Sequence, residues 1–182
     1  MGINPKTVKH ISSWGSLGFI GMDIFVSELG ILLKVISIYA PNQNRLEFWH
    51  SMLEHSLVMG TTIISGDLNF SLGMEESWGH HSQIDLILDQ MSTLLDTFKL
   101  VDVPMNKKMP TWHNRRTREA ALSRRLDHFL IHEDLLRTLP LYRKWVGIGS
   151  LSDHLPIYLQ ISGPSKKPRA PLKFFYGFLK DP

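Results

Sequence analysis

The sequence lacks cysteine, and it also lacks any long apolar run. With no cysteine among 182 residues, the chain has no disulfide and no thiolate metal site, which is common for intracellular proteins. No apolar stretch approaches the ~18 residues needed to span a bilayer, and the N-terminus lacks the basic-then-apolar pattern of a signal sequence. We therefore expect no membrane association and a nuclear or cytoplasmic location.

The net charge is low, but the charged residues are unevenly distributed. The formal charge is +3, whereas the stretch from 107 to 144 holds ten Lys or Arg residues and only four Asp or Glu residues. A local positive excess suits a polyanion, because phosphate neutralisation supplies most non-specific affinity for nucleic acid. A solvated basic face explains the same excess equally well. The remaining composition, 43% apolar and 20% charged, indicates one globular domain with a substantial core.

Hydrophobic periodicity predicts an alternation of strands and helices. Asn44 and Glu47 have the spacing of a capping box at the start of one helix. The resulting order, β-β-α-β-α-β-α-β-β, is that of an α/β protein with mixed strand directions. The predicted strands are 18–26, 31–39, 61–64, 126–131, 144–148 and 155–161, and the predicted helices are 44–59, 82–98 and 132–139.

Five short motifs stand at predicted strand ends or in the adjoining loops. A Gly-Asp pair at the end of a strand is commonplace, so each motif alone is a weak signal. Their fixed order is far more specific, and over roughly 15–182 it resembles the endonuclease/exonuclease/phosphatase superfamily, which has the deoxyribonuclease-I-like fold. More narrowly, it resembles the endonuclease domain of LINE-type (non-LTR) retrotransposons. The motifs are SIYAPN (37–42), SGDLNF (65–70), PTW (110–112), RRLDHFL (124–130) and SLSDHLPI (150–157).

The resemblance implies a four-layered α/β sandwich of two mixed β-sheets flanked by helices, here incomplete. The domain would cover 15–162, followed by a Pro/Lys-rich C-terminal tail at 163–182. The family begins with a strand carrying an Asn, a helix, and a strand that ends in a metal-binding Glu. No acidic residue precedes Asp23 in this sequence. We therefore expect an N-terminally truncated domain that lacks the first strands and that Glu.

The resemblance also implies a role for individual residues in phosphodiester hydrolysis, which needs an activated water and hydrogen-bond donors aimed at the phosphate. Asp67 would orient and activate the water, and Asn69 would position Asp67 and contact the phosphate. Asp127 would hydrogen-bond His154, fix its tautomer and favour its cationic form. Tyr39 would donate its hydroxyl to the phosphate.

A metal ion and a DNA-binding loop follow from the same resemblance. Asp153 would help to bind Mg²⁺ or Mn²⁺, and we expect weak binding because one carboxylate of the family site is missing. Trp112 would contact DNA by stacking, and Arg115, Arg116 and Arg118 would contact its phosphates.

Several of these residues also have an ordinary structural interpretation. Tyr39 can simply belong to a strand, and Asp153 can belong to a turn before the last predicted strand. Asp127 can form a structural ion pair with Arg124 or Arg125. The sequence leaves these alternatives open.

We expect a metal-dependent phosphodiesterase, specifically a DNA endonuclease of reduced activity, that acts as a monomer without a known protein partner. One alternative is a catalytically inactive, retrotransposon-derived remnant that binds nucleic acid through the basic segment. Another is a phosphatase acting on a small phosphoester, since this fold serves several phosphoesterases. The loop from Trp112 to Arg118 favours a polynucleotide substrate.

Overall fold

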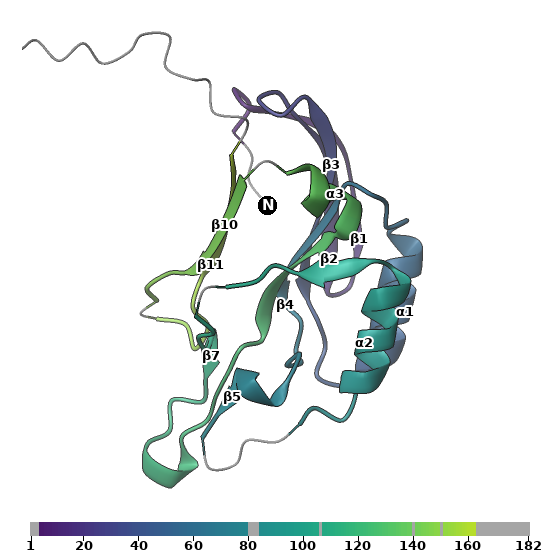
Figure 1. Cartoon of the computed structure of the whole chain (residues 1–182). Coiled ribbons are helices and arrows are strands. Elements are labelled where there is room, and N and C mark those ends of the chain that lie inside the picture. The colour runs from purple at the N-terminus through teal and green to yellow at the C-terminus, as the bar shows by residue number, and fades with distance from the viewer. Residues whose placement is uncertain (1–3, 80–83, 106, 140, 150, 163–182) are drawn as a thin grey trace, which may run out of the picture.

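A mixed six-stranded sheet forms the centre of the fold (Figure 1). The computed structural model describes residues 4–79, 84–105, 107–139, 141–149 and 151–162. The order of the strands is β1-β2-β3-β4-β9-β6; β3 and β4 are parallel, and the other neighbouring strands are antiparallel. The strands are β1 (Val8–Ser16), β2 (Phe19–Val26), β3 (Ile31–Tyr39), β4 (Thr62–Asp67), β6 (Leu100–Asp102) and β9 (Asp127–His132).

Two helices, α1 (Arg45–His55) and α2 (Leu88–Thr97), lie side by side against one face of this sheet (Figure 1). Trp49 of α1 is completely buried there, and its ring packs edge-to-face on Phe70 with the centroids 5.6 Å apart. Burial of such large apolar side chains supplies most of the driving force for the packing of helix on sheet. Among the described residues, no helix combines the length and the apolar character needed to cross a membrane.

Two smaller antiparallel sheets and a short helix complete the described fold. The hairpin β10–β11 packs Leu159 and Ile161 against the second face of the large sheet, near Ile63 and Ile131. A three-stranded sheet of order β5-β8-β7 lies beside the end of β4 (Figure 1). The elements are α3 (Glu133–Thr138), β5 (Ser77–Trp78), β7 (Trp112–His113), β8 (Ser123–Arg124), β10 (Leu141–Val146) and β11 (Ile157–Ser162), with 3-10 turns at Met74–Glu76 and Arg118–Ala120.

The predicted α/β class is confirmed, but several predicted boundaries are wrong. The helix predicted to end near 59 ends at His55, because Leu57 adopts a left-handed conformation with φ 46°. The predicted capping box is also wrong, since Asn44 is left-handed and its side chain makes no capping hydrogen bond. In the described part of the second predicted helix, the helix begins only at Leu88.

Five strands were not predicted, namely β1, β5, β6, β7 and β8. The described residues form one mixed sheet and two small antiparallel sheets, so the four-layered sandwich of two mixed sheets stays a prediction. The proposed tail at 163–182 lies outside the described residues.

The end of β4 requires glycine at position 66. Gly66 has φ 130°, and a Cβ at this position would collide with the carbonyl oxygen of Ile38 in β3. The neighbouring register pairs Tyr39 with Asp67. The close approach of the two backbones at Gly66 therefore determines how the ends of β3 and β4 meet.

We expect Gly66→Ala to lower the free energy of unfolding by roughly 1–3 kcal/mol through backbone strain alone, with the collision adding to that loss. Gly30→Ala is a matched control, because Gly30 also has a positive φ, 68°, but has nothing within 4 Å of an added Cβ. The control should cost about 1 kcal/mol. Urea unfolding of both variants measures the difference, and equal losses would contradict the role of the Ile38 contact.

Candidate active site

A cavity of about 440 Å³ lies where β3 and β4 end. Asp67, the last residue of β4, is paired with Tyr39 in the parallel ladder and lies opposite Asp127 in the antiparallel ladder with β9. His154, in the loop between β10 and β11, forms an isolated bridge with Trp112 of β7. Pairing between distant segments thus brings the predicted catalytic residues together.

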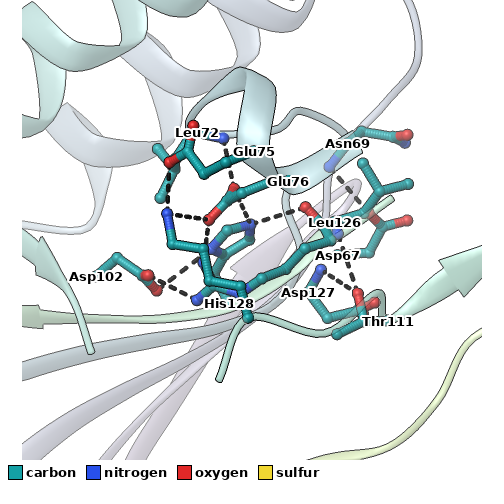
Figure 2. A network of polar contacts seen from close by, with 12 residues as sticks. Asp67, Asn69, Leu72, Glu75, Glu76, Asp102, Thr111, Leu126, Asp127 and His128 are labelled. Carbon is teal, nitrogen blue, oxygen red and sulfur yellow. Dashed lines mark hydrogen bonds and ion pairs between the residues drawn. The ribbon is translucent and has the colours of Figure 1, made fainter. Parts of the chain in front are cut away.

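His154 lies between two carboxylates. Its Nδ1 is 2.9 Å from Oδ2 of Asp127, which is a hydrogen bond, and its Nε2 is 3.8 Å from Oδ2 of Asp67, which is beyond hydrogen-bonding distance. The backbone N–H of Asp127 donates to the hydroxyl of Thr111 at 3.0 Å, as Figure 2 shows. Asp127 therefore orients the imidazole, and its predicted alternative as the partner of Arg124 or Arg125 is wrong.

Asn69 positions Asp67 mainly through its backbone. Asn69 has φ 56°, and its backbone N–H donates to Oδ1 of Asp67 at 2.9 Å (Figure 2). Its side-chain amide donates to the carbonyl oxygen of Ala40. Burial raises the pKa of the Asp67 carboxyl, and nearby Asp127 adds to that rise, although the N–H of Asn69 and the ring of His154 oppose it. A raised pKa makes Asp67 a stronger base in its ionised form.

Asp153 and Trp112 connect this cavity to a second one. The indole N–H of Trp112 donates to Oδ2 of Asp153 at 3.0 Å, and this bond holds the pKa of Asp153 below its ordinary value. Both residues line the first cavity and also an adjacent one of about 680 Å³, where Arg115 and Arg116 lie. Arg118 lines neither cavity, so it is separate from the other predicted DNA-binding residues.

The sequence motifs missed two arginines that line the first cavity, Arg45 and Arg124. Arg45 begins α1, binds both carboxylate oxygens of Asp85 at 2.7 and 2.8 Å, and donates to the carbonyl oxygen of Asn69. Its position three residues after the SIYAPN motif is the sequence feature that could have indicated its place in the cavity. Arg124 immediately precedes the RLD sequence and was considered only as a partner for an acid.

A buried network of charged residues lies beside the cavity (Figure 2). The side chain of Arg125 is only 2% exposed, and it bonds Glu76 and also Asp102, the latter at 2.6 Å. His128 is fully buried and lies 3.2 Å from Asp102, which also accepts a hydrogen bond from Lys144 at 3.1 Å. The burial of Lys144 lowers its pKa to about 8.

The spacing within this network is that of a possible metal site. Ligand atoms of Glu76, Asp102 and His128 all lie within 4.8 Å of one another. However, Arg125 and Lys144 already neutralise the two carboxylates, and a divalent cation here would be repelled by both. The arrangement therefore favours a charge-balanced structural network over a metal centre.

The cavity itself offers fewer ligands for a metal. Across the described residues, no group of three potential ligands includes Asp67 or Asp153. Both carboxylates nevertheless line the cavity. Mg²⁺ usually keeps several waters and binds through one or two carboxylates together with substrate phosphates. Asp67 and Asp153 are thus a fitting but minimal donor set.

The α/β fold thus brings carboxylates and an imidazole together at the ends of the strands. A family model described as endonuclease-reverse transcriptase matches residues 33–158, more than half of the chain. The chain belongs to this family, and the resemblance noted from the sequence motifs is confirmed.

Solved structures agree on the fold. The endonuclease domain of TRAS1, a telomere-specific non-LTR retrotransposon, is 20% identical with a TM-score of 0.62; the match covers 79% of this chain and 63% of that domain. D. rerio TDP2, solved with a single-strand DNA product, is 16% identical with a TM-score of 0.53, covering 86% and 70%. A mannosyl-6-phosphatase of Bacteroides thetaiotaomicron is 13% identical with a TM-score of 0.53, covering 86% and 68%. No curated protein matches the sequence.

We expect Arg125→Met to lower the free energy of unfolding by about 3–5 kcal/mol, because it leaves the buried carboxylate of Glu76 without its partner. Arg137→Met is the matched control, since Arg137 is 71% exposed and pairs with Glu133 at the surface. The control should change stability by at most about 1 kcal/mol. Chemical denaturation of both variants is the measurement, and a comparably small loss in Arg125→Met would refute the network's importance.

The stability of the fold should fall in acid because of Asp102. Burial alone would raise the pKa of Asp102, but His128, Lys144 and Arg125 together hold it well below its ordinary value of 3.8. The unfolded chain then takes up this proton at a higher pH than the folded chain does, so stability is lost as the pH falls below that ordinary value.

Free energies of unfolding, measured as the pH is lowered below the ordinary pKa of an Asp carboxyl, would test whether Asp102 causes this loss of stability. Asp102→Asn should be less stable at neutral pH and should show a weaker loss of stability in acid. Asp96→Asn, an exposed position in α2, should keep the loss seen in the unmodified protein. An unchanged acid dependence in Asp102→Asn would contradict the explanation.

Proposed function

We propose that this protein is a metal-dependent phosphodiesterase that cleaves DNA as an endonuclease. The observation that carries the proposal is that Asp67 and His154 line one cavity, and that Asp127 hydrogen-bonds the ring of His154 while the backbone N–H of Asn69 hydrogen-bonds Asp67. Asp67 and Asp127 face each other across the paired strands β4 and β9, and His154 comes from the separate loop between β10 and β11. Ordinary turn geometry therefore does not account for the arrangement.

The reaction would use Asp67 as the general base. Asp67 accepts a proton from water, the water oxygen attacks phosphorus, and the bond from phosphorus to the leaving oxygen breaks, with the leaving oxygen taking up a proton from solvent water. His154, held at Nδ1 by Asp127, presents Nε2 as a hydrogen-bond donor to a phosphoryl oxygen. Tyr39, which is 68% exposed at the rim, donates its hydroxyl to the same group, and Asn69 keeps Asp67 in place.

A divalent cation, when bound, would neutralise negative charge on the phosphate. The carboxylates of Asp67 and Asp153 would hold Mg²⁺ or Mn²⁺, with the substrate phosphate supplying further oxygen ligands. Two protein carboxylates imply weak binding of the cation in the absence of substrate.

A polynucleotide is the favoured substrate. Trp112 offers a surface for stacking a base, and Arg115 and Arg116 in the adjoining cavity can bind further phosphates along a strand. The fold alone does not decide the matter, because the TRAS1 endonuclease domain and a mannosyl-6-phosphatase both share it. A small phosphoester would leave the second cavity unused.

Purified protein should nick supercoiled plasmid in Mg²⁺ or Mn²⁺, and EDTA should stop the reaction. Asp67→Asn and His154→Ala should each lower the rate by at least about 10²-fold, which is the usual contribution of a general base or acid. Lys9→Gln, an exposed position in β1, should leave the rate unchanged. Because burial opposes the charged form of Asp67, Asp67→Asn should unfold at an equal or higher temperature.

Three other outcomes of the nicking assay would contradict the assigned site or the proposed function. Equal nicking by the variants and the unmodified protein would refute the assigned site. Salt-dependent DNA binding without cleavage would support a nucleic-acid-binding remnant. Hydrolysis of a small phosphoester, with no action on DNA, would support a phosphatase.

A further inference from the structure

Arg124 lies at the wall of the first cavity, in the centre of the three-stranded sheet. In the ladder of β8, its neighbours are Ser77 on one side and Trp112 on the other. Its side chain lines the cavity together with Asp67 and His154. No role described above uses this residue.

The guanidinium of Arg124 makes no hydrogen bond or ion pair within the part of the chain that the structure describes, and its Nε is buried. The other two arginines nearby differ in having ion pairs, because Arg45 binds Asp85 and Arg125 binds Glu76, although the Nε of Arg125 is also buried without a partner. A buried donor without a partner costs free energy. Because Arg124 lines the cavity, an anion entering it would meet a guanidinium that the described part of the chain leaves without a partner.

The neighbouring acids do not provide the missing partner. Asp127 is bound to His154, and Glu76 is bound to Arg125. Asp153 accepts the indole N–H of Trp112. Arg124 therefore forms no ion pair with any of these three carboxylates.

We propose that Arg124 is an anion-binding residue that contacts a non-bridging oxygen of the phosphodiester in this cavity. The proposal rests on the proposed function and extends it. The planar guanidinium matches two oxygens of a phosphate, which an ammonium group cannot do. Since Trp112 is its cross-strand neighbour, Arg124 would hold the phosphate while Trp112 stacks on an adjacent base.

The test measures binding of a fluorescent DNA duplex by anisotropy at several salt concentrations, in EDTA so that no cleavage occurs. Arg124→Gln should weaken binding roughly tenfold, as expected for the loss of a charged hydrogen bond. It should also reduce the slope of log K against log salt by about 0.9, which corresponds to one phosphate contact. Arg124→Lys should keep the slope and lose part of the affinity. Lys9→Gln should change neither quantity.

The outcomes separate this proposal from the proposed function. If the unmodified protein nicks DNA but Arg124→Gln keeps its affinity and salt slope, the role of Arg124 is overturned and the endonuclease function stands. A lower melting temperature with an unchanged slope would identify a structural role and would likewise overturn the proposal. If Arg124→Gln does not fold, a reduced slope in Arg124→Lys would overturn it. If the unmodified protein neither binds nor nicks DNA, the proposed function itself fails.

Discussion

The buried guanidinium of Arg125 joins parts of the chain on which the site depends. It bonds Glu76, just before β5, and Asp102, at the end of β6, while its backbone N–H donates to the carbonyl oxygen of Glu76. Strand β9 begins two residues later with Asp127. Because charges buried this deeply require their partners, the network fixes the point from which β9 starts. The orientation of Asp127, and through it that of His154, follows from this fixed point.

The site itself is electrostatically unfavourable for the fold. Asp67 and Asp127 face each other across a strand pair, and both are largely buried. Burial disfavours the charged form of Asp67 and repulsion by Asp127 adds to this cost, and the N–H of Asn69 and the ring of His154 offset only part of the sum. A purely structural strand pair would avoid two opposed acids. The arrangement is therefore better explained by chemistry than by stability.

Sequence motifs predicted the residues of the site well, because Asp67 ends a recognisable strand, Asp127 begins one and His154 lies shortly before one. They could not predict the pairing of Arg125 with Glu76, since 49 residues separate the two and no local pattern connects them. The two-residue strands β5, β7 and β8 were missed for a related reason: so short a strand shows no periodicity. The polar edge strand β1 was missed because its alternation is weak, with few buried positions.

The balance of charge in the cavity limits how a phosphate can be held there. Asp67 and Asp153 contribute negative charge, and the positive charge of Arg45 is already neutralised by Asp85. Additional cations would therefore tighten the binding of a phosphodiester in this space, because repulsion by two carboxylates weakens it. Among the described lining residues, the guanidinium of Arg124 supplies positive charge that no carboxylate already neutralises, and a divalent cation brought in with the phosphate would add to it. On this argument, substrate and metal would each strengthen the binding of the other, because each provides charge that the other lacks.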